Sequence, residues 1–252
     1  MIRTNIFNDT EAHRIAQKKG IYSVLEYVKD VSVTESTAIN AFFSAKMNVR
    51  KRQLVANIAD GGVVVQAGAM QLMLGDLTAA TNVKGAGDLF KKAIGSKVTG
   101  ESAIKPRYTG TGTLVLEPTY KHIILEDLAE WNGKMVIEDG LFLACDDTVN
   151  LSVVARNSLS SAALGGEGLF NTALSGSGVV ALESPVPMEE LIEVEVDNDV
   201  VKIDGNMAIA WSDTLKFTVE KTTKSLVGSA ASGEGFVNTY RGTGKILIAP
   251  VG

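Results

Sequence analysis

The stretch Gly110-Thr-Gly-Thr-Leu-Val-Leu-Glu-Pro118 decides the fold, because it returns twice further along the chain. The later copies are Gly176-Ser-Gly-Val-Val-Ala-Leu-Glu-Ser-Pro185 and Gly242-Thr-Gly-Lys-Ile-Leu-Ile-Ala-Pro250, so the period is 66 residues each time. Each copy follows a Gly-Glu pair, and these pairs are Gly100-Glu101, Gly166-Glu167 and Gly233-Glu234. A fixed period shared by turns, apolar runs and prolines is typical of an internally repeated architecture.

Short apolar runs broken by Gly, Asn and Asp fill the rest of each copy, as in Gln53–Ile58 before Asp60-Gly-Gly62. Such runs predict half-buried strands joined by tight turns, four or five to a unit. One such sheet cannot bury its own apolar face. We therefore predict an all-β protein of three tandem short double-stranded β-helix (jelly-roll-like) units around a pseudo-threefold axis. The units span residues 51–118, 119–185 and 186–252 and form one compact globular body.

The first fifty residues differ in character and predict an N-terminal arm with one or two short helices. Asp9-Thr10, an acidic start, a basic end and Gly20 predict a helix over Glu11–Lys19. Ile21–Val28 is typical of a strand. From Ser36 to Met47, apolar residues at three- and four-residue steps predict a second helix with one apolar face. These residues are Ile39, Phe42, Phe43 and Met47. We expect the arm to fold against the β core.

Composition limits the classes of partner. A formal net charge of −5 disfavours nucleic acid, whose phosphates need a basic surface. The single cysteine, Cys145, excludes an internal disulfide and fits a reducing compartment. The N-terminus lacks the apolar core of a signal peptide, and no apolar run approaches the roughly 20 residues of a spanning helix. The expectation is a soluble cytoplasmic protein, with peripheral membrane contact left open.

The repeated glycines and glutamates are the first candidate site. Gly176-Ser-Gly178 even matches part of a dinucleotide fingerprint, but that chemistry needs a helix after the glycines, and strands follow here. We therefore interpret Gly-x-Gly as a corner between strands. The equivalent carboxylates of Glu101, Glu167 and Glu234 have two interpretations. They form a ring that binds a cation or a small molecule or, as we favour, they accept hydrogen bonds from the backbone N–H groups of their own turns.

A contact surface is the second candidate. It is a short amphipathic stretch with basic flanks, made of Leu89, Phe90, Lys91, Lys92 and Ile94. Such a stretch binds a protein or a membrane surface, or simply caps the open end of a sheet. The basic residues Lys46, Arg50, Lys51 and Arg52 are interpreted as a solvated strand edge or arm rather than an RNA site.

Candidate catalytic residues are scarce. The two histidines, His13 and His122, lack the spacing of a zinc site, and no nucleophile elbow occurs. Asp146-Asp147 would raise rather than lower the pKa of the Cys145 thiol. We expect no catalytic residue, no metal and no cofactor, and no enzyme activity. A carboxylate-based hydrolase stays as a third hypothesis.

Ala67-Gly-Ala-Met-Gln71, the threefold Gly-Glu and Gly233-Glu-Gly-Phe-Val-Asn238 together resemble a known family. It is the bacterial branch of the mitochondrial-biogenesis family named for altered inheritance of mitochondria, grouped by fold with the tryptophan RNA-binding attenuation protein. The resemblance covers roughly residues 47–252. Copy one departs from it, since Ser102 replaces a glycine. The resemblance implies pseudo-symmetric β units that often oligomerise, and it implies no catalytic residues.

The sequence thus predicts a non-enzymatic scaffold or binding protein that acts as a homo-oligomer through equivalent loops, with a protein or a membrane surface as partner. The alternative is a module that binds small molecules or nucleic acid in clefts between repeats. The strands Gln53–Ile58 and Lys245–Ala249 either close within the chain or pair with another chain.

Overall fold

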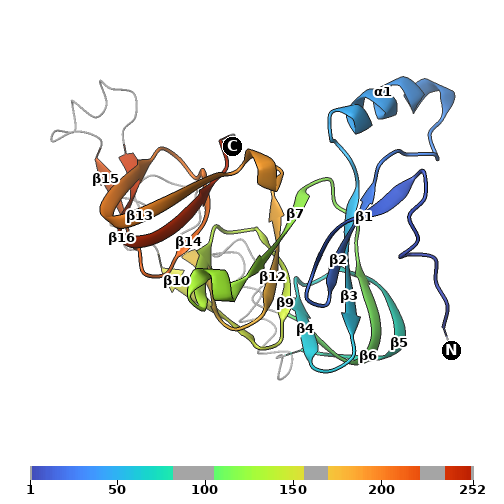
Figure 1. Cartoon of the computed structure of the whole chain (residues 1–252), viewed down its shortest axis with the longest axis horizontal. Helices are drawn as coiled ribbons and strands as arrows, with labels where there is room; N and C mark the ends of the chain where they lie inside the picture. The colour runs from blue at the N-terminus through green and yellow to red at the C-terminus, as the bar shows by residue number, and fades with distance from the viewer. Residues whose placement is uncertain (1, 82–104, 156–169, 222–235, 251–252) are drawn as a thin grey trace, which may run out of the picture.

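The computed structural model describes residues 2–81, 105–155, 170–221 and 236–250. Within these ranges the chain forms sixteen strands, one α-helix and two 3-10 turns. The sheets curl into barrel-like bodies that follow one another along the long axis of the molecule (Figure 1). The prediction of a β protein with a helix in its N-terminal arm is confirmed.

Two sheets contain all the described strands. The larger one runs in the order β1-β2-β3-β6-β4-β9-β12-β7, with β5 paired to β6. Its strands are β1 (His13–Lys19), β2 (Tyr22–Tyr27), β3 (Arg52–Ile58), β4 (Gly62–Val65), β5 (Met70–Ala80), β6 (Arg107–Leu116), β7 (His122–Asp127), β9 (Phe142–Asp146) and β12 (Val179–Ser184).

The smaller sheet runs in the order β10-β11-β8-β14-β16-β13, with β15 paired to β16. Its strands are β8 (Lys134–Ile137), β10 (Val149–Ala155), β11 (Phe170–Gly176), β13 (Ile192–Ile203), β14 (Ala208–Ser212), β15 (Lys216–Lys221) and β16 (Phe236–Ile248). The 3-10 turns are η1 (Leu128–Trp131) and η2 (Met188–Glu190). All pairings between the described strands are antiparallel.

The predicted helix over Glu11–Lys19 is wrong, because this segment forms β1 and pairs with β2 from His13↔Tyr27 to Lys19↔Tyr22. Gly20, the expected end of that helix, has φ +56 and lies in the hairpin turn instead. The end of a helix and a hairpin turn both require a positive φ, which glycine adopts without strain. The difference is that β2 is a buried strand with an open edge, and pairing with it satisfies the backbone of residues 13–19.

The second helix is confirmed as α1 (Glu35–Lys46). The rest of the arm folds against the β core, since β1 and β2 join the larger sheet and Ile6 and Phe7 pack on it, but the helix does not. None of its residues is buried, and the helix projects from the end of the larger sheet (Figure 1). The expected apolar face is therefore left exposed, and of its members Phe42 also borders a cleft beneath the helix.

Each Gly-x-Gly lies within or between strands, as predicted, and not before a helix. Gly110, Gly176 and Gly242 have φ of 118°, 120° and 130°, a region that side-chain-bearing residues avoid. At Gly110 the backbone of the neighbouring strand is so close that an added Cβ would lie 2.1 Å from the carbonyl oxygen of Asp76. At Gly110–Gly112 the glycines let β5 and β6 approach closely while they stay in register, whereas at Gly242–Gly244 the register of β13 and β16 shifts.

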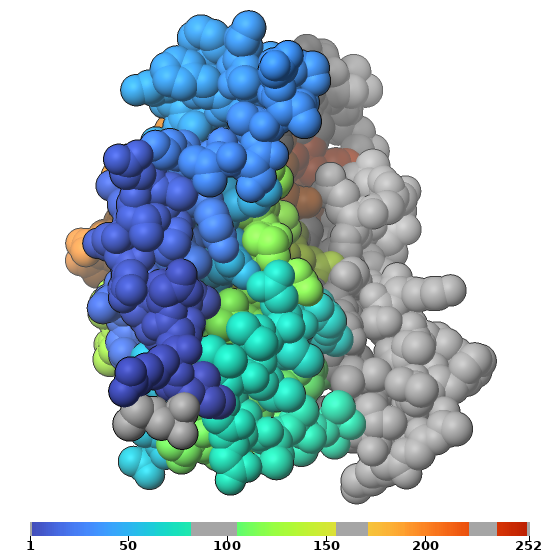
Figure 2. Space-filling model, turned by 90° about the vertical axis from the view of Figure 1, so that its right-hand side faces the viewer, coloured from blue at the N-terminus to red at the C-terminus, as the bar shows by residue number. Residues whose placement is uncertain are grey.

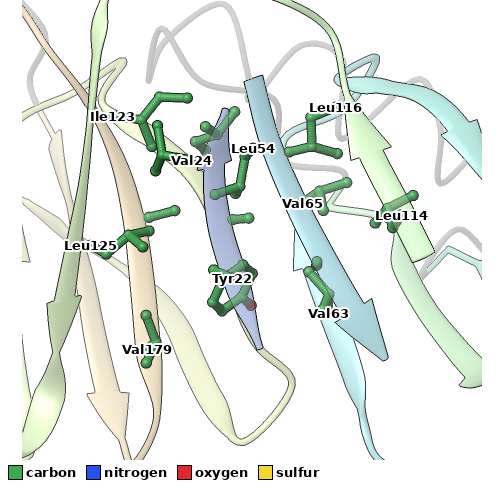
Figure 3. Packing of buried hydrophobic residues seen from close by; sticks show 14 of the residues in the cluster. Tyr22, Val24, Leu54, Val63, Val65, Leu114, Leu116, Ile123, Leu125 and Val179 are labelled. Atoms are coloured by element: carbon green, nitrogen blue, oxygen red, sulfur yellow. The ribbon is translucent and has the colours of Figure 1, made fainter. Parts of the chain in front are cut away.

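The core is divided among the curled bodies. Tyr22, Leu54 and Leu125, from three different strands, point into one of these cores together with neighbours from β4, β6 and β12 (Figure 3). A second core surrounds Trp131 and a third surrounds Trp211. At roughly 25 cal/mol per Å² of apolar surface removed from water, these cores are the main source of stability.

The strands expected at a sheet edge are closed within the chain. β3 pairs with both β2 and β6, and the end of β16 pairs with both β13 and β14. The pseudo-threefold axis and the double-stranded β-helix units stay predictions.

Candidate functional site: the N-terminal helix and the cleft beneath it

The residues predicted as sites lie outside the described part of the chain. This holds for the three carboxylates Glu101, Glu167 and Glu234. It holds equally for the amphipathic stretch Leu89, Phe90, Lys91, Lys92 and Ile94. Both hypotheses stay predictions, and the candidate site is built from the arm.

The outer face of α1 exposes large apolar side chains. Their exposed fractions are 70% for Ile39, 58% for Phe42, 61% for Phe43 and 77% for Met47. The two phenylalanine rings contact each other edge to face at 5.5 Å, and the Lys46 ammonium lies 5.4 Å from the Phe42 ring centroid. Together with Val31, Val33 and Val49, seven exposed large apolar residues fall within nineteen residues of sequence. A concentration of this kind marks a contact surface.

The inner face of α1 carries small residues. Ala38, Ala41 and Ala45 line the clefts between the helix and the sheet. A helix that packs on a core normally turns its large apolar residues inward. On α1 the alanines take this position, with Phe42 at their border, and none of the large apolar residues is buried.

A buried ionic cluster holds the helix at its C-terminal end. Asn48, at φ 63°, ends the helix, and the Val49 N–H donates to the Ser44 carbonyl at 2.9 Å. The Glu26 carboxylate on β2 accepts from Arg50 at 2.8 Å and lies 3.0 Å from the Arg52 guanidinium. Arg50 also donates to a carbonyl of the last helical turn, Ala45 O, at 2.9 Å.

The charges of this cluster depend on one another. Burial by itself would raise the pKa of Glu26, but the hydrogen bond from Arg50 and the charge of Arg52 outweigh it and hold that pKa below its usual value. Both Glu26 and Arg52 are nearly buried, at 6% and 4% exposure. The interpretation of the basic residues as a solvated strand edge is therefore wrong in part, because Arg50 and Arg52 are structural anchors.

A cleft of about 700 Å³ lies between α1 and the sheet. A chain of hydrogen bonds crosses its floor. The Tyr27 hydroxyl donates to Gln53 Oε1 at 2.6 Å, and Gln53 Nε2 donates to Gln71 Oε1 at 2.7 Å. The walls add apolar atoms from Val31, Val49 and other residues. This volume lies within the range of small-molecule sites.

Three further titratable groups have pKa values that burial shifts away from their ordinary range. Burial, together with the neighbouring Asp146, raises the pKa of the Cys145 thiol, so the thiolate is disfavoured. Burial also raises the pKa of Asp146, whose Oδ2 accepts the Val179 N–H at 2.9 Å. Burial lowers the pKa of His122, as does the charge of Arg52. Among the described residues, no group of His, Cys, Asp and Glu is arranged to hold a metal.

The fold and the arm define a class of protein: curled β-sheets in series that carry an anchored helix with an exposed apolar face. The family model described as "Mitochondrial biogenesis AIM24" matches residues 45–251. The chain belongs to this family. The match begins near the end of α1, so most of the helix precedes it.

Two relatives come from Streptococcus pyogenes. An uncharacterized protein of serotype M6 is 30% identical over 196 residues, which are 75% of this chain and 76% of the relative. The crystal structure of a second S. pyogenes protein has a TM-score of 0.60 at 27% identity and covers 81% of this chain and 90% of that one. Neither description assigns a function.

Sequence reasoning missed the cleft and the outward direction of α1. The helical spacing of Ile39, Phe42 and Phe43 indicates a face, but spacing alone does not say what that face contacts. One signal is present in the sequence: Ala38, Ala41 and Ala45 give the neighbouring face of the helix no large apolar side chain.

Proposed function

We propose that the protein is a non-enzymatic β scaffold that docks on an anionic membrane surface through the outer face of α1. The observation that carries this proposal is the exposure of Ile39, Phe42 and Phe43 on α1 and of Met47 at its end, each at 58% or more. Interfacial helices bind membranes through such apolar side chains, which enter the boundary between headgroups and acyl chains.

The charge of the arm favours a lipid surface. Residues 26–52 contain five basic and three acidic side chains, while the whole chain has a net charge of −5. With Arg50 and Arg52 paired to Glu26, three lysines and two carboxylates of this stretch are left for the surface. Among the basic groups, Lys46 is exposed beside the Phe42 ring. Anionic lipids attract such groups by about 1 kcal/mol each, and the acidic remainder of the chain is repelled. The arm would therefore meet the membrane first.

The helix would lie on the membrane rather than cross it. α1 has 12 residues, against the roughly 20 that a spanning helix needs. None of the described helices is long and apolar enough to span a bilayer. Phe42 and Ile39 would enter the interface, while Lys46 would reach the headgroups from beside the Phe42 ring.

The use of the ionisable groups supports a non-enzymatic role. Glu26 anchors the helix, Asp146 accepts the N–H of Val179 at the start of β12, and Cys145 is buried with a raised pKa. Three equivalent units around a pseudo-threefold axis belong to the same proposal. One shared feature supports them: β6 pairs with β5, β12 with β9 and β16 with β14 through equivalent registers.

The test is vesicle flotation with the full chain. Vesicles of phosphatidylcholine are compared with vesicles that also contain phosphatidylglycerol. We expect the wild type to float with the anionic vesicles, and a variant carrying Ile39→Ser, Phe42→Ser and Phe43→Ser to lose at least tenfold in binding. A matched control carries Val153→Ser, Val154→Ser and Met188→Ser, which replace exposed apolar residues elsewhere.

Equal flotation of the wild type and the α1 variant would reject the proposed surface. Failure of the wild type to float with either vesicle would reject a membrane as the partner of α1. A groove on a partner protein would then be the alternative. Unchanged far-UV circular dichroism of the α1 variant establishes that the loss is not unfolding.

The cleft beneath α1 favours a second candidate function, binding of a small molecule. Its floor is fixed by the Tyr27–Gln53–Gln71 chain and its volume is about 700 Å³. Native mass spectrometry of the purified chain tests this. Retained extra mass that disappears in a variant with Ala45→Trp, which fills the cleft, would support it. A bare chain mass would count against it.

A further inference from the structure

Two joints between curled bodies share one geometry. Strand β4 pairs with β9 through Val63↔Asp146, Val64↔Cys145 and Val65↔Ala144. Strand β8 pairs with β14 through Met135↔Ser212, Val136↔Trp211 and Ile137↔Ala210. The flanking hydrogen bonds also match, from Gln66 N to Leu143 O at 2.8 Å and from Glu138 N to Ile209 O at 3.0 Å.

Strand β5 pairs with β6 in the way that β9 pairs with β12 and β14 pairs with β16. In each of these three pairs the register skips one residue on β5, β9 or β14. These registers are Val180↔Cys145 to Leu182↔Phe142, Ile246↔Trp211 to Ile248↔Ala208, and Leu114↔Met73 to Leu116↔Met70. Met73 on β5 is therefore the counterpart of Cys145 and Trp211.

Strands β4 and β8 are the other partners in the two joints. Their counterpart in the third body is the second half of β13. Tyr108 pairs with Val63, and Leu174 pairs with Met135. At the equivalent position of the third body Tyr240 pairs with Val201. Lys202 on β13 is therefore the counterpart of Val64 and Val136, which occupy the centres of the two joints.

These two counterparts do not meet within the chain. Among the described residues β5 pairs only with β6, and β13 pairs only with β16. β5 lies at the end of the molecule opposite to β13 (Figure 1), and the surface of β5 faces the viewer in Figure 2. Leu72 and Met73 are 43% and 38% exposed, whereas their counterparts Ala144, Cys145, Ala210 and Trp211 are exposed by 2% or less.

We propose that a second copy of this chain fills the open edge, with β13 of one copy paired antiparallel to β5 of the next. The register of the two joints places Val201 opposite Leu74, Lys202 opposite Met73 and Ile203 opposite Leu72. The contact repeats a joint that the chain already makes twice, and it covers the apolar edge of β5. The apolar stem of Lys202 lies over Met73, while its ammonium stays at the surface, where it lies 3.8 Å from Glu220 Oε2.

Such a contact joins different surfaces of the two copies. Head-to-tail contacts generate closed rings or open filaments and do not stop at a symmetric dimer. Each copy would bring one α1 to the assembly, so several weak arm contacts would act together. The pairing does not depend on the function proposed for the arm.

Cysteine pairing tests the contact in solution without vesicles. Residues directly opposite each other in antiparallel strands have Cα separations of about 4.5–5.5 Å, close enough for a disulfide. We expect Met73→Cys and Lys202→Cys chains to give a cross-linked dimer only when they are mixed. The native Cys145 is fully buried and its raised thiol pKa keeps it unreactive.

The mixed dimer without dimers of either chain alone is the expected result. Cross-linking of Met73→Cys chains with themselves would overturn the head-to-tail geometry, and no cross-linking in the mixture would overturn the contact. Failure of vesicle flotation would leave this result untouched, so the two proposals fail separately.

A charge pair at the same position provides the second test. Met73→Lys would face Lys202 of the next copy, whereas Met73→Glu would face it with opposite charge. Like charges directly opposite destabilise strand pairing and opposite charges stabilise it. We expect native mass spectrometry to show oligomers for the wild type and Met73→Glu, and the 26.6 kDa chain for Met73→Lys.

Met188→Lys, at a residue 46% exposed outside both edges, is the matched control and should remain oligomeric. A wild type that stays at 26.6 kDa at tens of micromolar, or a Met73→Lys variant that assembles as well as Met73→Glu, would overturn the proposal.

Discussion

Helix α1 and the third curled body use the same kinds of side chain in opposite ways. In the third body, Trp211 and Tyr240 are 2% and 1% exposed, and their rings meet at 5.3 Å. On α1, Phe42 and Phe43 contact each other at 5.5 Å, yet each is more than half exposed. The aromatic pair stabilises the fold in one place and is left available in the other.

The difference lies in what holds each region in place. The third body is held by apolar packing between β13, β14 and β16. Helix α1 is held by polar contacts that converge on Glu26, and none of its own residues is buried. A region anchored by charges can keep its apolar face free for a contact.

The largest expected effect is in the core. Trp211→Ala should reduce the free energy of unfolding by about 3–5 kcal/mol, because it removes a buried ring and leaves a cavity. Urea unfolding followed by circular dichroism measures this. Phe42→Ala is the matched control, and an equal loss there would contradict the comparison.

The anchor should come second. Glu26→Gln leaves the Arg52 guanidinium buried without its carboxylate, at a cost of roughly 3 kcal/mol in the free energy of unfolding. The variant should also loosen α1. Hydrogen exchange at residues 35–46 would rise if the cluster holds the helix, and unchanged exchange would show that it does not.

The same variant gives a pH dependence. The pKa of Glu26 is lowered in the folded chain, so its contribution to stability is present at neutral pH and is lost as the pH falls through that lowered pKa. The stability difference between the wild type and Glu26→Gln should therefore be constant near pH 7 and shrink below about pH 4. A difference that persists in acid would contradict the charge account.

The repeated glycine should come third. Gly110→Ala forces a side chain into φ +118° and places its Cβ 2.1 Å from Asp76 O. Backbone strain of this kind costs about 1–3 kcal/mol before any clash. Gly68→Ala is the control, since it also has positive φ but no atom within 4 Å of the added Cβ. Thermal unfolding should show the larger drop for Gly110→Ala.

The smallest effect is expected on α1. Ile39→Ser, Phe42→Ser and Phe43→Ser should each change the free energy of unfolding by no more than about 0.5 kcal/mol, as surface substitutions do. A larger loss for these residues would mean that the face packs on the protein in solution.

Much of the β body could be predicted, because strands and glycine corners are local features. The run after Gly110 is a strand in the structure, and the helix near residues 36–47 lies within one residue of its predicted start and end. The segment from Glu11 to Lys19 shows the limit. Its capping signals favour a helix, but pairing with β2 makes it a strand, and pairing is not local.

The candidate site was harder to predict for the same reason. The apolar spacing of α1 indicates a face, but the direction of that face depends on Glu26. This carboxylate precedes the helix in the sequence and is joined to its C-terminal end through Arg50 and Arg52, a contact that exists only in the folded chain. The open edge of β5 likewise requires the register of three strand pairs.

The most direct measurement is the fluorescence of Phe42→Trp with and without anionic vesicles. The native Trp131 and Trp211 are each 2% exposed and give a constant buried background. The account predicts that Trp at position 42 emits at long wavelength and is quenched by acrylamide in solution, and that vesicles shift its emission to the blue and protect it. Emission that is already blue-shifted and protected without vesicles would contradict an exposed contact face.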